Sequence, residues 1–106
     1  MLCSLTMFPV GDGTSMCKPV AEVVDEIDRA GLHYEVTGMD TIVEGDWDDV
    51  MPVIHRAEER MRDRYGRVYM SLTVDDRAGA TNRLHDAVAD VERELGRHVE
   101  HGTGPR

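Results

Sequence analysis

Apolar positions in the first third of the chain follow an extended pattern and then a helical one. The opening apolar and β-branched residues predict a strand that ends at Pro9. In the glycine-containing loop over residues 11–15, the hydroxyl of Thr14 or Ser15 is suited to cap a helix. We expect that helix over about residues 18–30, because apolar residues recur there at helical spacing. They are Val20, Val23, Val24 and Ile27.

Two short segments with strand character come next. Residues 33–37 alternate in polarity, and residues 41–45 begin with β-branched side chains. The intervening residues 38–40 contain a glycine, which is typical of a turn. Because the connection is so short, the two strands are predicted to form an antiparallel hairpin.

A long helix is predicted after the hairpin, ending near Tyr65 ahead of Gly66. Its start depends on Pro52, which lacks a backbone N–H. If Asp48 caps the helix, the proline removes only the first hydrogen bond within it. If the helix begins at Asp46, we expect a kink that costs about 3 kcal/mol. The apolar stripe consists of Trp47, Val50, Met51, Ile54, Ala57, Met61 and Tyr65.

The last predicted elements are a strand and a third helix. Residues 67–74 form the longest strand candidate, and a helix over about residues 82–95 follows, capped by Thr81. Residues 98–106 lack periodicity, which predicts a flexible C-terminal tail. The apolar face of the strand is Val68, Met70, Leu72 and Val74, and the stripe of the helix is Leu84, Val88, Val91 and Leu95.

The element order is therefore β-α-β-β-α-β with an added C-terminal helix. Two β-α-β crossovers joined by a hairpin are typical of the ferredoxin-like α+β fold, with a four-stranded antiparallel sheet and two helices on one face. We expect one such domain over residues 1–97, followed by the tail over residues 98–106.

The opposite face of the predicted sheet is of intermediate polarity. In the last strand it would carry Tyr69, Ser71 and Thr73, which form neither a charged surface nor a closed core. The third helix would cover part of it, and half-apolar sheet faces commonly meet another subunit or a ligand. We therefore expect a homodimer or homotetramer.

Composition and charge exclude several classes of protein. The chain has 106 residues, with 12 Lys and Arg against 21 Asp and Glu, a net charge of −9. This acidic balance disfavours binding to nucleic acid or to an anionic membrane, both of which attract basic surfaces. Apolar runs stay well short of the roughly 18 residues of a membrane span. The first residues lack signal-peptide features, so we expect a cytoplasmic protein.

The cysteines and histidines fit no metal-binding or catalytic motif. Cys3 and Cys17 have no CxxC spacing, and we expect a buried thiol in the first strand and another near the first helix start. His98 and His101 are expected to be solvated near the C-terminus. With no apparent nucleophile–base pair, we expect neither catalysis, a metal nor a cofactor. The other histidines, His33, His55 and His85, are scattered along the chain.

Two loops are weaker candidates for chemistry. Asp75, Asp76 and Arg77 follow the last strand, where the carboxylates could either hold a cation or only fix the loop. The loop over residues 11–15 superficially resembles a phosphate cradle. It lacks the spacing of the known phosphate motifs, and Asp12 would repel phosphate.

The hairpin is the better candidate for a ligand site. Glu35 and Glu44 are either exposed positions on paired strands or the partner of a bound organic cation. Tyr34 and Met39 on the same hairpin offer polarizable surface that suits an aromatic heterocycle, although packing in the core or between subunits would use them equally well.

These segments together resemble a known family. The chain is similar to the small thiamine-binding proteins, the YkoF-like group first described as a domain of unknown function. The order and spacing of the shared segments extend over about residues 3–96. The segments are residues 8–15, residues 34–41 with Val43, Glu44 and Gly45, His55 with Ala57 and Glu58, Arg67 with Val68, and residues 74–77.

The resemblance implies a ferredoxin-like fold in dimers or tetramers. It also implies non-catalytic binding of thiamine or its hydroxymethylpyrimidine part, as a carrier, scavenger or sensor. The competing interpretation is a structural or regulatory oligomeric module with no small-molecule ligand. The ligand-binding positions that the resemblance implies are Thr14, Ser15, Tyr34, Thr37, Met39, Thr41, Glu44 and Asp76.

Overall fold

A computed structural model describes residues 1–11 and 16–101 of the chain. The strands are β1 (Leu2–Pro9), β2 (His33–Val36), β3 (Thr41–Glu44) and β4 (Val68–Asp75). The helices are α1 (Cys17–Arg29), α2 (Trp47–Tyr65) and α3 (Arg83–Leu95). Their order is β1-α1-β2-β3-α2-β4-α3. The predicted order of elements and the α+β ferredoxin-like fold are therefore confirmed.

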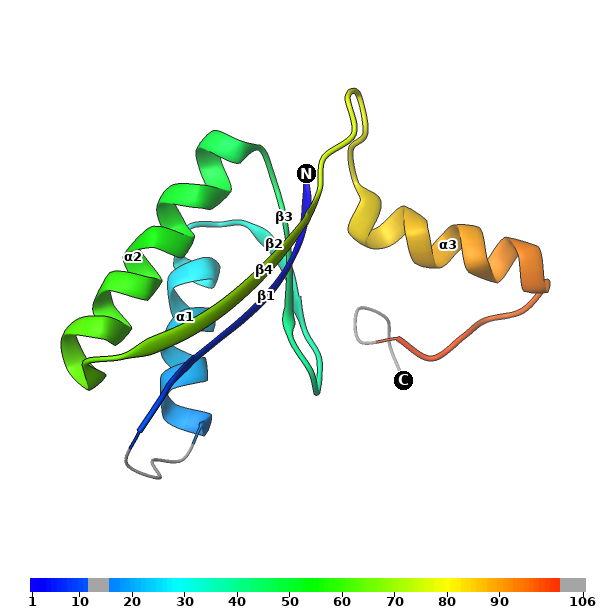
Figure 1. Ribbon diagram of the computed structural model, residues 1–106. Coiled ribbons are helices and arrows are strands. Elements are labelled where there is room, and N and C mark those ends of the chain that lie inside the picture. Colours follow the sequence, from blue (N-terminus) through cyan, green and yellow to red (C-terminus); the bar gives the residue numbers. More distant parts are fainter. Residues whose placement is uncertain (12–15, 102–106) are drawn as a thin grey trace.

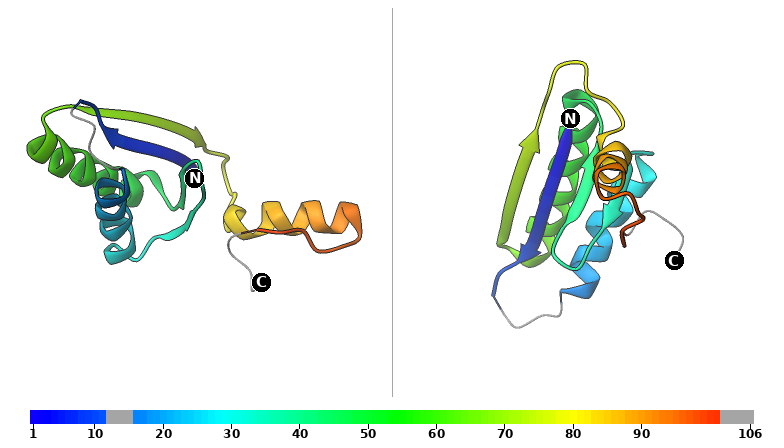
Figure 2. Two further views of the ribbon diagram at one scale, coloured as in Figure 1. Left: turned by 90° about the horizontal axis from the view of Figure 1, so that it is seen from below. Right: turned by 90° about the vertical axis from the view of Figure 1, so that its right-hand side faces the viewer.

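The four strands form one antiparallel sheet in the order β2-β3-β1-β4. Helices α1 and α2 lie on one side of the sheet, which we call the helix side (Figure 1). Helix α3 lies on the other side, the open side, and extends away from the sheet (Figures 1 and 2). This arrangement leaves most of the open side without a covering helix.

Alternation along the strands separates the core from the open side. In β1, Cys3, Leu5 and Met7 are buried, whereas the residues between them are only partly covered. Helix α1 contributes Val23 and Ile27 to the same core. Burial of these apolar groups stabilises the fold by roughly 25 cal/mol per Å². The other core residues are Val43, Val50, Val53, Ile54, Ala57 and Met61.

Two predictions about helix starts are resolved by the structure. Helix α2 has Asp46 as its N-cap, so Pro52 lies inside the helix and removes a hydrogen bond there. The prediction that Thr81 caps the third helix is wrong, because the N-cap is Asn82, in the left-handed backbone region at φ 55°. The proposed cap of the first helix, Thr14 or Ser15, falls outside the described residues.

Helix α3 has a strongly amphipathic sequence but little to pack against. None of its residues, all of which the structure describes, is buried, and its main contacts with the sheet are with β3. Val91 is 50% exposed and Leu95 is 51% exposed. The predicted apolar stripe is therefore present, but it covers only a small part of the open side.

Cys3 is buried and Cys17 is exposed at the start of α1, as expected. Residues 98–101 form neither helix nor strand, and residues 102–106 lie outside the described part, so the flexible tail stays a prediction. Over residues 1–11 and 16–101, no helix has both the length and the apolar character needed to cross a bilayer.

Candidate functional site

The open side carries a hollow of about 250 Å³ at one end of the sheet. Its walls come from the end of β3, the start of β2, and the segment that leads into α3. Two carboxylates, those of Glu44 and Asp46, lie in this wall together with the imidazole of His33. The other lining residues are Met1, Gly45, Ala80, Thr81 and Asn82.

The strand register explains why His33 and Glu44 meet. His33 on β2 is paired with Glu44 on β3, and Glu44 is paired with Leu2 on β1. Leu2 is in turn paired with Asp75 on β4. Residues paired in this way project from the same face of a sheet. One row across the open side therefore runs from His33 through Glu44 and Leu2 to Asp75, with the apolar side chain of Leu2 between the two carboxylates.

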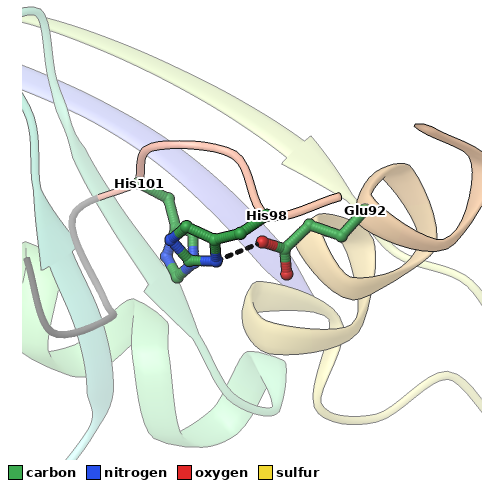
Figure 3. Close-up of side chains that lie close together, drawn as sticks. All are labelled: Glu92, His98 and His101. Carbon is green, nitrogen blue, oxygen red and sulfur yellow. Dashed lines mark ion pairs between the residues drawn. The ribbon is translucent and has the colours of Figure 1, made fainter. Parts of the chain in front are cut away.

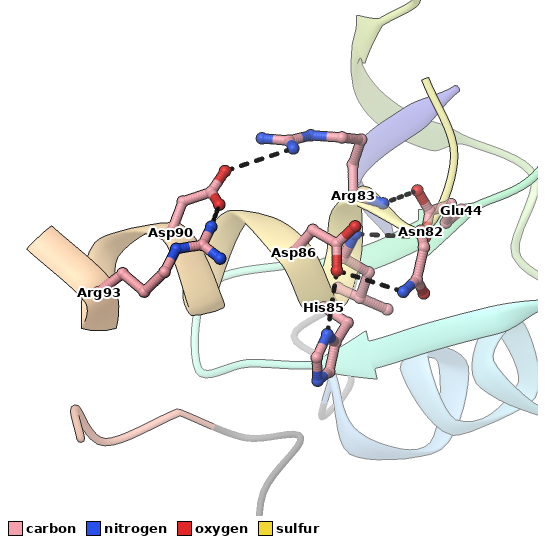
Figure 4. Close-up of polar contacts among 8 residues, drawn as sticks. Glu44, Asn82, Arg83, His85, Asp86, Asp90 and Arg93 are labelled. Atoms are coloured by element: carbon pink, nitrogen blue, oxygen red, sulfur yellow. Dashed lines mark hydrogen bonds and ion pairs between the residues drawn. The ribbon is translucent and has the colours of Figure 1, made fainter. Parts of the chain in front are cut away.

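Glu44 is the central group of this row. Its carboxylate accepts hydrogen bonds from the backbone N–H groups of Arg83 and Leu84, the latter at 3.2 Å (Figure 4). These two N–H groups belong to the first turn of α3, where no carbonyl of the helix can satisfy them. The carboxylate therefore caps α3 from the end of β3, and its charge interacts favourably with the helix N-terminus.

A second hollow of about 160 Å³ adjoins the first along the same strands. It is lined by Leu2, whose strand partner Glu44 belongs to the first hollow, and by Ile42, the partner of Ser4. Its surface is almost entirely apolar. The two hollows together offer an acidic end and an apolar end, which suits an organic cation with a planar ring.

The sequence-predicted ligand residues do not form one group. Tyr34 pairs with buried Val43 and packs against the core on the helix side, opposite Glu44. Its hydroxyl donates a hydrogen bond of 2.9 Å to Asp28, and this bond raises the pKa of Tyr34. Thr41 is also on the helix side, where it is 4% exposed. Of these three hairpin positions, only Glu44 faces the hollow.

Thr37 and Met39 form the turn at the other end of the hairpin. The Thr37 hydroxyl donates to the Asp40 carboxylate at 2.7 Å and accepts from the backbone N–H of Met39 at 3.1 Å. The Asp40 carboxylate also accepts a hydrogen bond from Ser4 on the open side of β1. The Met39 side chain is 87% exposed. These hydrogen bonds hold the turn together, and residues 37–40 line neither of the two hollows.

The last three predicted ligand positions add little to the site. Asp76 is exposed just after β4. It makes a small contribution to the raised pKa of the Cys3 thiol, whose main cause is burial. Thr14 and Ser15 lie outside the described residues.

Sequence reasoning missed His33 and Asp46 as parts of the acidic hollow. The signal for both was their position relative to Glu44. His33 begins the strand that pairs with β3, and Asp46 follows Glu44 by two residues. Finding them required the hairpin register, because a shift of one residue would have moved His33 to the helix side.

A larger, shallow hollow of about 600 Å³ lies on the surface of α1 and α2. Its lining is charged, and Glu26 there pairs with Arg60 at 3.1 Å and with Arg56 at 3.8 Å. Arg64 likewise pairs with Glu22. Because most of these charges are paired with one another and are open to water, this surface is a weaker candidate for a ligand site than the hollow beside Glu44.

The same fold occurs in solved structures. A hypothetical protein from Methanocaldococcus jannaschii, MJ1052, superimposes with a TM-score of 0.78 at 24% identity, over 85% of this chain and 93% of that one. A putative thiamine biosynthesis/salvage protein from Thermotoga maritima gives a TM-score of 0.73 at 21% identity, over 85% and 96%. At these identities the likeness establishes the fold.

Sequence comparison establishes the family. The family model described as "Thiamine-binding protein" matches residues 3–92. A UPF0045 protein of Mycobacterium bovis is 36% identical over 96 residues, covering 90% of this chain and 94% of the relative. A UPF0045 protein of Methanothermobacter thermautotrophicus is 34% identical over 94 residues, covering 86% and 95%. The chain belongs to the thiamine-binding protein family.

Proposed function

We propose that this protein binds thiamine or its hydroxymethylpyrimidine part in the cytoplasm without transforming it, as a carrier, scavenger or sensor. Membership of the thiamine-binding family supports the choice of ligand. The observation that carries the proposal is the Glu44 carboxylate in the acidic hollow of about 250 Å³ on the open side. The ligand positions that lie away from this hollow stay predictions of the family resemblance.

The chemistry of the ligand matches the two adjoining hollows. Thiamine joins a thiazolium cation to an aminopyrimidine ring, so it has one charged end and one flat neutral end. The cation is expected beside Glu44 and Asp46, where opposite charge stabilises it. The neutral ring is expected over Leu2 and Ile42, where it covers apolar surface.

The net charge of −9 predicts an order of affinity among the vitamers. Each added phosphate group carries negative charge toward an acidic surface, so the phosphate esters should bind more weakly than thiamine itself. The hydroxymethylpyrimidine lacks the thiazolium cation and should lose the part of the affinity that comes from Glu44.

We also propose that the working form is a homodimer or homotetramer. Support comes from the exposed apolar stripe of α3, in which Val91 and Leu95 are each about half exposed, and from β4, a strand of eight residues at the edge of the sheet. Apolar stripes and unpaired strand edges are surfaces that a second copy can cover.

The same stripe favours one alternative, an assembly module that uses its open side only to associate and binds no small molecule. Phe8 and Tyr69, stacked on the open side with ring centroids 5.2 Å apart, would then pack against another subunit. The two functions differ in whether the hollow beside Glu44 stays accessible after assembly.

Native mass spectrometry with and without thiamine separates the two functions. The proposal predicts a dimer or tetramer that gains up to one thiamine mass for each chain. Calorimetric titration with thiamine, its phosphates and the pyrimidine should then give affinities in the order argued above. An oligomer that binds none of these compounds would support the assembly module and reject the ligand function.

A further inference from the structure

Three potential metal ligands meet beside the last turn of α3, away from the hollow described above. They are the carboxylate of Glu92 and the imidazoles of His98 and His101 (Figure 3). Each residue offers one nitrogen or oxygen atom, and these three atoms lie within 4.8 Å of one another. The Nδ1 of His98 is 2.6 Å from Oε2 of Glu92, and the two imidazole centroids are 5.2 Å apart.

The backbone holds this cluster together. Gly96 adopts a left-handed conformation with φ 74° and ends α3, and its N–H donates to the carbonyl of Glu92 at 2.8 Å. The N–H of Arg97 donates to the same carbonyl at 3.2 Å. The chain then runs back alongside α3 (Figure 1), which brings His98 over the side chain of Glu92.

The Glu92 carboxylate is also oriented from outside the cluster. The backbone N–H of Val99 donates to its Oε2 at 2.9 Å. This hydrogen bond, followed by the two nearby imidazoles, lowers the pKa of Glu92. Hydrogen bonds of this kind fix the direction of a metal-binding carboxylate in known sites.

Two imidazole nitrogens and one carboxylate oxygen define the class of ion. Mg²⁺ and Ca²⁺ prefer sets made only of oxygen, whereas Zn²⁺, Co²⁺ and Ni²⁺ accept this mixture. Ligand atoms around a tetrahedral Zn²⁺ lie about 3.3 Å apart, given bonds of about 2.0–2.1 Å. The three ligand atoms lie within 4.8 Å of one another, and all three residues are partly or fully open to solvent, which leaves their side chains room to rotate toward that spacing.

We propose that Glu92, His98 and His101 form a binding site for a divalent transition-metal ion such as Zn²⁺. The ion takes the place of the proton between Glu92 and His98, and the three ligands leave its fourth position open to water or a small ligand. Metal binding joins the end of α3 to the segment that follows it. The site does not depend on the proposed binding of thiamine.

The test uses the full chain, free of metal and of any histidine tag, titrated with Zn²⁺ by calorimetry. Co²⁺ is then added and followed by its visible absorption, which reports coordination geometry. The double variant His98→Asn/His101→Asn removes two ligands, and Glu92→Gln removes the carboxylate charge. A matched control, His55→Asn/His85→Asn, also removes two histidines that each contact one carboxylate.

We expect one Zn²⁺ per chain in the unaltered protein and in the control. The cluster double variant should lose about 100-fold or more in affinity, since even indirect contacts to a metal ligand are worth about 10–100-fold. Glu92→Gln should also weaken binding and alter the Co²⁺ spectrum. The proposal is overturned if the unaltered protein takes up no Zn²⁺ or Co²⁺, or if the cluster double variant binds as tightly as the control.

Discussion

The carboxylate of Glu44, at the end of β3, accepts a hydrogen bond from the backbone N–H of Arg83, which lies 39 residues further along the chain. This contact joins the central sheet to the helix that has the fewest other contacts with the body of the protein. The residue that we propose to hold the thiamine cation is thus the same residue that anchors α3. Changes at Glu44 are therefore expected to affect both.

Replacing Glu44 by Ala should loosen α3 while leaving the core intact. Loss of a helix-capping side chain costs about 0.5–2 kcal/mol, and α3 has no buried residue among those described to offset it. Hydrogen exchange of the α3 amides should become faster in Glu44→Ala. The control variant Thr81→Ala removes the side chain that the sequence suggested as the cap. The α3 amides should exchange in this variant as they do in the unaltered protein. Equal protection of α3 in both variants would argue against the anchor.

Gly45 should tolerate no side chain. A Cβ atom there would lie 2.9 Å from Cγ2 of Val50, which is fully buried, and 3.4 Å from Cδ2 of Leu32. Gly45→Ala should therefore lower the free energy of unfolding by about 1–3 kcal/mol, measured by denaturant titration. At Gly38 a Cβ would meet nothing within 4 Å, so Gly38→Ala should be nearly neutral. Similar stabilities for the two variants would contradict this packing.

The hydrogen bond from Tyr34 to Asp28 should be visible in a titration. Because it favours the neutral phenol, the pKa of Tyr34 is raised above its ordinary value of 10.0. Its contribution to stability is complete below pH 10 and is lost as the pH rises through the raised pKa. Asp28→Asn should return the pKa of Tyr34, followed by NMR, toward the ordinary value, whereas Asp25→Asn should not. An unshifted pKa in the unaltered protein would refute the bond.

The apolar stripe of α3 should govern assembly. Val91→Lys/Leu95→Lys places two charges on residues that are each about half exposed in the single chain. If a second copy covers them, the double variant should sediment or elute as a smaller species, because burying unpaired charges is costly. Glu94→Lys, an exposed position on α3 outside this stripe, is the control. Assembly that survives in the double variant would exclude the stripe from the interface.

Local patterns predicted the fold well because each strand and helix carries its own signal. In β1 the structure buries Cys3, as predicted, together with Leu5 and Met7 at alternate positions. In β4 the face with Tyr69, Ser71 and Thr73 stays exposed, but Met70 and Val74 on the predicted apolar face are exposed as well. The period of a strand predicts which residues share a face, but it does not predict how much of that face the helices cover.

Contacts between distant segments could not be predicted in the same way. Tyr34 and Glu44 are on one hairpin, but the register sends them to opposite faces, so the predicted pocket wall is divided. Thr81 has the right chemistry for a helix cap, yet the first N–H groups of α3 donate instead to the Glu44 carboxylate on β3. Glu92 meets His98 only because the chain reverses at Gly96.

The most direct measurement compares the affinities of thiamine and of hydroxymethylpyrimidine for the unaltered protein and for Glu44→Gln by calorimetry. A role for Glu44 as the partner of the cation predicts that thiamine loses more affinity than the uncharged pyrimidine. A role limited to anchoring α3 predicts equal losses. The control Glu58→Gln removes a carboxylate on α2, on the opposite side of the sheet, and should change neither affinity. Equal losses in Glu44→Gln, or no thiamine binding by the unaltered protein, would contradict the account.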